Sequence, residues 1–358
     1  MTECRGCGES EPRRVLDLGD VPAADHFPRA IDPVVPQETS HPLAMGLCPV
    51  CGLAQLADDD TVADEPRGVE PQALKDQAAA ALRTVESAGW LGGRTVREFG
   101  SPHGGTWLPL LADHGFTASD DRGDVVLDCF GMMHERDQRN AFAGRAGAVN
   151  PGGVLLLQYH SILTIVRHGQ WNALRHGHFA YYSLTTLMRL LRAVGIGVVS
   201  AWEFDLYGGT VLVGAVRGDT EPDDSVLRVL AAERRVGITE ARAFTGLQTQ
   251  ADRHAASLRA WLQTEVASGN TVMAYGAASR AVALFSRAGL TSELLAGVAD
   301  ASPGKHGRRM PGTDIAIVTP AELLEAKPDR VLLTVPDLLS EVSAQFPEFD
   351  GRWQVDDF

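Results

Sequence analysis

Four of the five cysteines stand in two closely spaced pairs in the first part of the chain. Cys4 and Cys7 enclose two residues, Cys48 and Cys51 enclose two more, and a glycine follows each pair. Two such pairs can hold four thiolates in a tetrahedron around one ion, and glycine permits the tight turns that this requires. Because four thiolates leave no open coordination position, the pattern predicts a structural zinc site. Disulfide bonds are the alternative.

The composition narrows the classes of partner. The chain has 358 residues, is 44% hydrophobic and carries a formal net charge of -14. Such a charge repels a nucleic-acid backbone, and the arginines are dispersed, so nucleic acid is not an expected partner. The longest apolar runs are interrupted well before membrane-spanning length, and the start of the chain does not resemble a signal peptide. We therefore expect a cytoplasmic protein that binds neither nucleic acid nor membrane.

The elements that position the cysteines and other chemical groups form a clear order along the chain. Residues 1–62 are rich in proline and turn formers, which predicts a small zinc-binding module. Strand-like and helix-like segments alternate over 63–218 and end in an expected antiparallel strand pair. Residues 219–268 are expected to form a helical linker, and 269–358 repeat the alternation. The predicted fold class is α/β, with two Rossmann-like doubly wound domains and an N-terminal zinc-binding module.

Several longer segments share a pattern with one enzyme family. They read "CRGCG", "VLDLGDVPAADHF", "HPLAMGLCPVCGLAQL", "YGAASRAVAL" and "VADASPGKHGRRMPGTDIAI". With this order of modules, the chain resembles the nucleotide-deoxysugar C-methyltransferases, which add a methyl group to C3 of a 4-keto sugar. The resemblance implies a nucleotide-diphosphate sugar as substrate, with thymidine diphosphate as the expected nucleotide.

The resemblance points to histidines in the middle of the chain. The family stretch of the type "QFDTIYHEH" matches "QWNALRHGH" here, so the final histidine is His178, while Arg175 and Gly177 replace a tyrosine and a glutamate. A family histidine at a strand exit matches His160. A histidine can remove a proton next to a ketone if another group stabilises the enolate oxygen. The resemblance implies His178 as the base, with His160, Arg175 or His176 as the stabilising group. A solvated loop with one buried histidine is the alternative.

The glycine-rich turn "REFGSPHGG" matches the family loop E-I-G-S-N-D-G, which faces the amino-acid end of S-adenosylmethionine. The matching residues are Glu98, Gly100, Ser101 and Gly104. Pro102 removes an amide donor from this loop, and His103 stands where the family has a carboxylate for the methionine ammonium group. The loop therefore predicts a damaged cofactor site.

The segment after this loop is short. Between Gly105 and the strand beginning near Asp124 there is room for one helix and a turn, so two strand-helix units of a methyltransferase are expected to be absent. Asp120 or Asp121 could replace the family's ribose-binding carboxylate. The sequence thus indicates that the sugar is bound but S-adenosylmethionine is not.

These departures favour a cofactor-independent epimerase or isomerase of a nucleotide-linked keto sugar. Removal of a proton and its return to the opposite face inverts the carbon without a methyl donor. Two alternatives stay open. One is an S-adenosylmethionine-dependent sugar C-methyltransferase, and the other is a non-catalytic member of the family with a binding role.

The nucleotide sugar is expected to contact the C-terminal domain. A strand-to-helix turn at "AYGAASR" can present amides and a helix dipole to a diphosphate. The resemblance implies that the loop "DASPGKHGRRMPG" supplies ribose or phosphate contacts. It also implies that the backbone of "YGGT" lies close to the active-site cleft. The candidate substrate-binding residues are Tyr207, Gly276, Ala277, Ser279, Asp300, Lys305 and Arg308.

Overall fold

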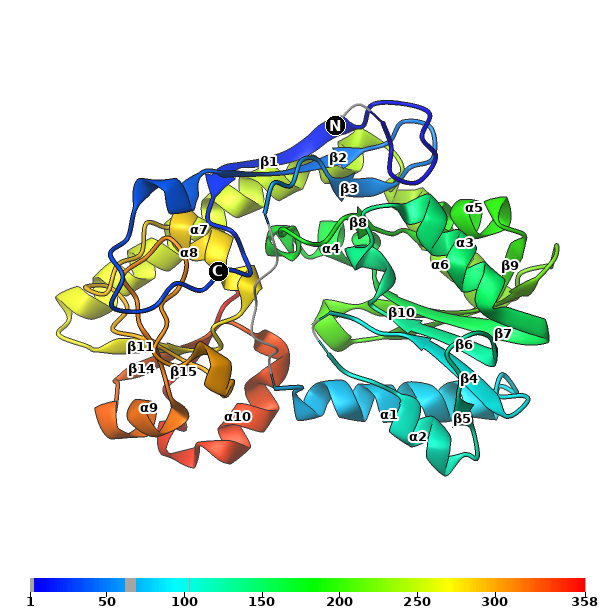
Figure 1. Cartoon of the computed structure of the whole chain (residues 1–358). Helices are drawn as coiled ribbons and strands as arrows, with labels where there is room; N and C mark the ends of the chain where they lie inside the picture. The colour runs from blue at the N-terminus through cyan, green and yellow to red at the C-terminus, as the bar shows by residue number, and fades with distance from the viewer. Residues whose placement is uncertain (1–2, 62–68, 103, 358) are drawn as a thin grey trace.

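The computed structural model describes residues 3–61, 69–102 and 104–357, arranged around three β-sheets (Figure 1). In this described part, no helix is long and apolar enough to cross a membrane. The expected boundary at residues 62 and 63 falls outside the described residues, as does His103.

The N-terminal sheet is antiparallel and has the order β1-β2-β3-β8. Its strands are β1 (Arg13–Val21), β2 (His41–Leu47), β3 (Ala54–Leu56) and β8 (Ala180–Tyr181). The fourth strand comes from the middle of the chain and pairs with β3 through Ala54 and Tyr181. The sheet around the cysteines therefore extends beyond the first 62 residues and holds part of the segment that carries His178.

The second sheet has six strands in the order β5-β4-β6-β7-β10-β9. These are β5 (Thr117–Ala118), β4 (Thr95–Phe99), β6 (Gly123–Cys129), β7 (Val149–His160), β10 (Thr210–Arg217) and β9 (Ile196–Phe204). The first four are parallel, and β10 is antiparallel to both of its neighbours. The expected closing antiparallel pair is thus present.

Helices cover both faces of this sheet because successive strand residues point to opposite sides. Val125 and Leu127 of β6 pack in a core with α1 (Gln72–Ser87) and α2 (Leu108–Asp113), whereas Val126 packs in the core on the opposite face. That opposite face is covered by α3 (Gln138–Ala148), α5 (Leu184–Ala193) and α6 (Asp224–Val236) (Figure 1). The pattern is that of a Rossmann-like domain.

The edge beyond β4 is reduced. After α2 the chain forms the two-residue strand β5, both of whose residues are exposed, and it enters β6 five residues later. The prediction that two strand-helix units are absent is corrected here, since one of the two keeps a short strand. Within the described residues, β5 is the last strand at this edge of the sheet.

The C-terminal sheet is parallel, with the order β13-β12-β11-β14-β15. The strands are β11 (Val272–Tyr275), β12 (Val298–Ala299), β13 (Ile317–Val318), β14 (Arg330–Leu333) and β15 (Trp353–Val355). Helices α7 (Thr245–Ala267) and α8 (Ser279–Arg287) share one core with Val272 and Ala274. Helices α9 (Pro320–Ala326) and α10 (Leu339–Gln345) share another with Met273 and Tyr275. This is the second doubly wound unit that the sequence predicts.

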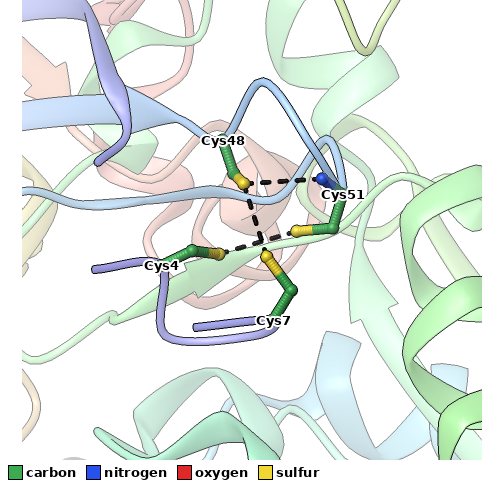
Figure 2. Close-up of side chains that lie close together, drawn as sticks. All are labelled: Cys4, Cys7, Cys48 and Cys51. Atoms are coloured by element: carbon green, nitrogen blue, oxygen red, sulfur yellow. Dashed lines mark hydrogen bonds between the residues drawn. The ribbon is translucent and has the colours of Figure 1, made fainter. Parts of the chain in front are cut away.

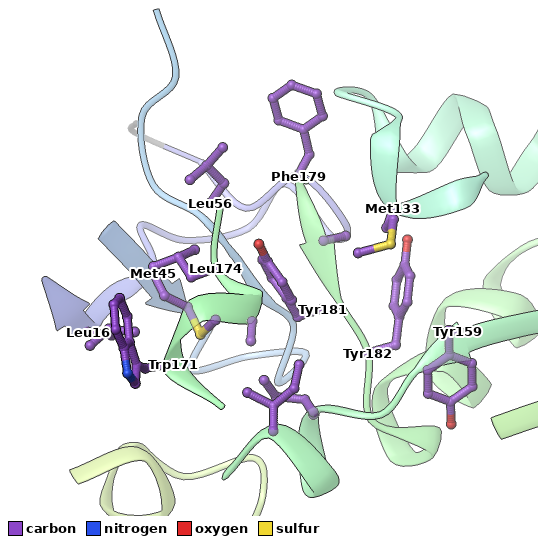
Figure 3. Packing of buried hydrophobic residues seen from close by; sticks show 14 of the residues in the cluster. Leu16, Met45, Leu56, Met133, Tyr159, Trp171, Leu174, Phe179, Tyr181 and Tyr182 are labelled. Carbon is purple, nitrogen blue, oxygen red and sulfur yellow. The ribbon is translucent and has the colours of Figure 1, made fainter. Parts of the chain in front are cut away.

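The N-terminal sheet lies across both larger units (Figure 1). Buried Arg309 bonds both carboxylate oxygens of Glu38, with Nη1 at 2.8 Å and Nη2 at 2.6 Å, while Arg287 donates to the carbonyl of Leu18. On the other side, Trp171, Leu174 and Tyr181 pack in one core with residues of β1 and β2 (Figure 3). The loop between residues 171 and 181 is therefore held firmly by the N-terminal sheet.

Candidate functional site

The four paired cysteines converge on one point (Figure 2). Their sulfur atoms all lie within 4.8 Å of one another, with Cys4 Sγ 3.5 Å from Cys51 Sγ and Cys7 Sγ 3.7 Å from Cys48 Sγ. Zinc–sulfur bonds of about 2.3 Å in a tetrahedron place the sulfurs about 3.8 Å apart, close to these values. The same distances are far beyond a disulfide bond. The cluster therefore fits a zinc ion held by four thiolates.

The cluster also supports the six-stranded unit. The carbonyl of Cys51 accepts a hydrogen bond from Thr186 Oγ1 of α5, and Arg189 of the same helix donates to the carbonyl of Val50. A Cβ on Gly6 would come within 3.0 Å of Leu53 and 3.1 Å of Leu190, so the turn packs closely. A metal at the cysteines would stiffen the contact between the N-terminal sheet and α5.

A second cluster forms where the middle segment meets α8. Arg175 donates through Nε to His178 Nε2 at 2.8 Å and through Nη1 to Ser279 Oγ at 2.7 Å. The ring of His134 lies edge-on to that of His178, with centroids 4.5 Å apart. The structure therefore brings together Arg175, His178 and Ser279, three of the residues that the sequence singled out.

The N-terminal sheet positions this loop. The hydroxyl of Tyr181 in β8 donates to the carbonyl of Ala173 and accepts the amide proton of Arg175. Gly177 adopts a φ of 77°, and its amide donates to Asp59 Oδ2. The left-handed turn at Gly177 separates the directions of its two neighbours.

His176 lies on the other side of that turn. Its Nε2 contacts the carbonyl of Pro42 at 3.2 Å, and its ring packs against His41 of the N-terminal sheet. It is 1% exposed. The structure therefore places His176 away from Arg175 and His178, in the packing of the loop.

His160 begins a separate chain of hydrogen bonds that leads to the C-terminal unit. Its Nε2 lies 3.1 Å from Gln170 Oε1, Gln170 Nε2 donates to the carbonyl of Tyr207, and the Tyr207 amide donates to Asp337 Oδ1. Tyr207 has a φ of 56°, and a Cβ on Gly208 would collide with Gln170. Gly208 is therefore required for this arrangement, which links the strand exit of β7 to the C-terminal unit.

Burial and neighbouring charge set the protonation state of His160. Burial, followed by the positive charge of Arg280, lowers its pKa to about 3, so the imidazole is neutral near pH 7. Since Gln170 Nε2 donates to Tyr207, Gln170 Oε1 is left to accept the Nε2 proton of His160. A neutral His160 with so low a pKa suits hydrogen bonding rather than proton abstraction or stabilisation of an anion by charge.

This depressed pKa predicts a pH dependence of stability. The unfolded chain binds the His160 proton below about pH 6.5, while the folded chain excludes it until about pH 3. The free energy of unfolding should therefore fall as the pH is lowered through that window. Urea unfolding of wild type and His160→Gln at several pH values tests this, because the variant should show a shallower loss. Identical pH profiles would contradict it.

Four residues beside the second cluster and the His160 chain were not predicted from the sequence: His134, Gln170, Arg280 and Asp337. Arg280 Nη2 donates to Asn172 Oδ1 on the same loop as Arg175. His134 and Asp337 follow β6 and β14, and Arg280 follows β11. Ligands of open parallel sheets bind beyond the carboxyl ends of the strands. This rule could have marked His134, Arg280 and Asp337 as candidate ligand contacts from the sequence.

The other candidate substrate contacts form an internal network. The Ala277 amide donates to Asp300 Oδ2, and Lys305 Nζ donates to the Ala277 carbonyl while it packs over Phe27. Arg308 donates to the carbonyls of Gly304 and Phe27. Gly276 has a φ of 99° and lies against Thr334. The structure thus gives Asp300, Lys305 and Arg308 protein partners and does not bring them into the second cluster.

The glycine-rich turn lines a small cleft that is partly open to solvent. Glu98 accepts from Thr106 Oγ1 and from the Trp107 amide, and the Gly104 amide donates to the Ser101 carbonyl. The cleft is also lined by Gly100. These internal bonds occupy part of the Glu98 carboxylate and the amide of Gly104, so fewer groups of the turn are left for a ligand.

The cleft lies next to the second cluster. Phe130 lines it, and the Phe130 ring is 5.8 Å from that of Tyr207, whose ring is 6.2 Å from His160. Cys129 is half-buried and also lines the cleft. A group bound in the cleft would thus lie beside Tyr207.

The cleft fits S-adenosylmethionine in one part. The carboxylates of Glu70 and Glu98 can face its ammonium and sulfonium charges, and Gly104 and Gly105 both have positive φ and allow close approach. For the adenosine part, the described edge of the sheet offers little. Asp120 is fully exposed and pairs with Arg97 at 3.3 Å.

Known proteins and family models match this chain over most of its length. A family model described as "C-methyltransferase C-terminal domain" matches residues 205–354, and one described as "Putative zinc binding domain" matches residues 4–63. C-methyltransferase NovU of Streptomyces niveus is 26% identical over 403 aligned positions, which cover 99% of this chain and 95% of that protein. Because the alignment is longer than the 358 residues of this chain, NovU has segments that this chain lacks.

Solved methyltransferase structures match part of the chain. Magnesium protoporphyrin IX methyltransferase ChlM of Synechocystis PCC 6803, with bound SAH, is 10% identical, with a TM-score of 0.30, over 41% of this chain and 84% of its own. The N-methyltransferase NodS of Bradyrhizobium japonicum WM9 is 11% identical, with a TM-score of 0.31, over 42% of this chain and 99% of its own.

Proposed function

Because this chain belongs to the C-methyltransferase family with an N-terminal zinc-binding domain, we propose that it methylates a nucleotide-linked keto sugar at the carbon next to the ketone. The observation that carries the proposal is the contact of Arg175 with both His178 and Ser279. It joins a candidate base and a permanent cation at the first residue of α8. Such a pair suits the removal of a proton next to a carbonyl group.

His178 acts as the base in this proposal. In the ligand-free arrangement, the Nε proton of Arg175 occupies the lone pair of His178 Nε2. A ketone oxygen placed beside Arg175 competes for that donor, and the nitrogen of His178 is then able to accept the substrate proton. The guanidinium, which stays charged at all working pH values, stabilises the enolate oxygen that forms.

The methyl donor would bind in the cleft lined by Glu98 and the glycine-rich turn, which we call the Glu98 cleft. Glu70, Glu98 and the turn at Gly104 and Gly105 would hold S-adenosylmethionine by its amino-acid end. When bound, this cofactor supplies an electrophilic methyl group. Phe130 and Tyr207 lie between the cleft and His160.

A second candidate function is epimerisation without a methyl donor. The two-residue strand β5 and the exposed Asp120 favour it, because they leave the adenosine part poorly supported within the described residues. The same deprotonation by His178 would then be followed by return of a proton to the opposite face. Both candidates share the enolate and differ in what attacks it.

Calorimetry separates the two candidates. The zinc-loaded protein is titrated with S-adenosylmethionine and, separately, with thymidine diphosphate, and Glu98→Gln is the matched variant. Micromolar binding of both ligands, with S-adenosylmethionine binding weakened in Glu98→Gln, supports methylation. Binding of thymidine diphosphate alone supports epimerisation. Binding of neither contradicts a nucleotide-sugar enzyme and leaves a different binding role for the chain.

A further inference from the structure

The loop that carries Arg175 and His178 spans residues 170–178. Apart from one short helical turn that begins at Trp171, this loop has no regular secondary structure within the described chain, so side-chain bonds must fix its position. The hydroxyl of Tyr181, in the N-terminal sheet, bonds the middle of the loop. The start of the loop is fastened instead by α7 and by the residue that follows β15.

A chain of two hydrogen bonds reaches Trp171 from the C-terminal unit. The indole Nε1 of Trp171 donates to His254 Nδ1 at 3.1 Å, and the other ring nitrogen of His254, Nε2, lies 2.6 Å from Asp356 Oδ1. The three residues are buried, at 1%, 8% and 8% exposed. The amide of Asp356 donates to the Leu333 carbonyl of β14, so the parallel sheet places the carboxylate. Bonds made away from water in this way hold their groups strongly.

The bonding groups determine which nitrogen of His254 carries the proton. An indole N–H can only donate, so Nδ1 must accept. The ring proton then lies on Nε2, where it donates to the carboxylate of Asp356. Without that acceptor, the ring could carry its proton on Nδ1, and two donors would face each other at Trp171. Asp356 therefore orients the ring nitrogen that holds Trp171.

Asp356 also acts on the next residue of the loop. Asn172 accepts a hydrogen bond from Arg280 Nη2. Burial, followed by the charge of Arg175, lowers the pKa of Arg280, while the charge of Asp356 opposes this shift. The same carboxylate therefore favours the cation that bonds Asn172, so its influence reaches two adjacent residues at the start of the loop.

We propose that His254 and Asp356 are positioning residues, which hold Trp171 and thereby the loop that presents Arg175 and His178 to the substrate. A displacement of about 1 Å at a reacting group can cost about 100-fold in rate, so the anchoring of this loop matters for the base that it carries. The reaction that the loop serves rests on the proposed function, whereas the hydrogen-bonded chain does not.

Two substitutions of His254 separate positioning from packing. His254→Leu removes both hydrogen bonds, whereas His254→Gln keeps an acceptor for Trp171 and a donor for Asp356. In heavy water with a thymidine diphosphate 4-keto sugar, we expect His254→Leu to slow hydrogen exchange next to the ketone about 10- to 100-fold. Asp356→Leu should be slowed similarly, and His254→Gln should keep most of the wild-type rate. The affinity for thymidine diphosphate, measured by calorimetry, should be nearly unchanged in all three variants.

The matched control on α7 is Arg259→Gln, because Arg259 Nη1 bonds the carbonyls of Ala288 and Gly289 and so joins α7 to α8. It should exchange hydrogen at the wild-type rate. Near-ultraviolet circular dichroism first shows which variants are folded, and Asp356→Leu provides the same test if His254→Leu does not fold. A folded His254→Leu or Asp356→Leu that matches the wild-type rate would overturn the positioning role, as would a His254→Gln that is equally slow.

The Arg175 side chain gives a second readout that needs no substrate. Its Nε–H, which donates to His178, is followed by nuclear magnetic resonance with isotope-labelled arginine and identified by its loss in Arg175→Lys. The resonance should shift in His254→Leu and Asp356→Leu and stay in place in His254→Gln. If wild type exchanges no hydrogen, the proposed function fails and this resonance still decides the positioning role. An unmoved resonance in His254→Leu would contradict that role and leave the proposed function standing wherever wild type exchanges.

Discussion

Replacing His178 with alanine is expected to slow hydrogen exchange next to the ketone of a thymidine diphosphate 4-keto sugar about 100- to 10,000-fold. The variant loses the imidazole whose Nε2 lies 2.8 Å from Arg175 Nε. Arg175 keeps Ser279 as a partner, so the charge near the ketone remains while the base is gone. Proton resonance in heavy water, with exchange at the carbon next to the ketone as the readout, measures the loss.

The matched control is His114→Ala, because His114 is an exposed histidine directly after α2 with Leu110 and Glu86 as partners. It should exchange at the wild-type rate. Substrate binding by His178→Ala, measured by calorimetry with thymidine diphosphate, should be little changed. An exchange rate within a few-fold of wild type in His178→Ala would assign the base to another group.

Replacing Cys48 with serine is expected to release zinc and to lower the thermal midpoint by about 10 °C or more. A structural zinc ion held by four thiolates contributes about 10 kcal/mol or more to the folded form of small zinc domains, and one missing thiolate forfeits a large part of it. The cluster also fixes α5 through the carbonyls of Val50 and Cys51. Atomic absorption gives the zinc content, and differential scanning calorimetry gives the midpoint.

Cys129→Ser is the control for the zinc experiment, since Cys129 lines the Glu98 cleft and is remote in sequence from the four ligands. It should keep one zinc per chain and a nearly unchanged midpoint. Full zinc content in Cys48→Ser, or an unchanged midpoint after chelation of wild type, would show that the four cysteines do not hold a stabilising metal.

Much of the architecture could be read from local pattern. Apolar runs such as "DVVLDCF" alternate with helix-like segments, and this period switch predicts both doubly wound units. The antiparallel pair β9 and β10 also follows from its two closely spaced apolar runs. Two-residue strands cannot be predicted from such local patterns. Thr117 and Ala118 of β5 are exposed, and their strand exists because β4 offers an edge.

Long-range pairing explains the other difference in the fold. Tyr181 pairs with Ala54, which places a segment from the middle of the chain in the N-terminal sheet. Local propensity contains no information on such a partner. The sequence therefore predicts a domain boundary at residue 62, whereas in the structure β8 from the middle of the chain belongs to the N-terminal sheet.

The candidate site was predictable only where the resemblance named residues. His178 and Arg175 meet in the structure, but their contact with Ser279 spans 104 residues and has no local signal. His176 and His178 are two residues apart and look equivalent in sequence. The left-handed turn at Gly177 sends one ring to Pro42 and leaves the other beside Arg175.

The carried-over loop contacts show the opposite effect. Lys305 and Arg308 match the family pattern, yet Lys305 is 4% exposed and bonds the Ala277 carbonyl, and Arg308 bonds that of Phe27. Sequence identifies a cation but not the acceptor nearest to it. Arg280, which the pattern did not mark, has a buried donor that lacks a protein partner within the described residues.

Incubation of the zinc-loaded protein with a thymidine diphosphate 4-keto sugar in heavy water tests the central claim most directly. We predict that deuterium enters at the carbon next to the ketone and that this exchange requires the wild-type protein. Added S-adenosylmethionine should convert the same carbon to a methylated centre. A sugar that keeps its proton at that carbon, with and without S-adenosylmethionine, would contradict enolate chemistry at the cluster of Arg175 and His178.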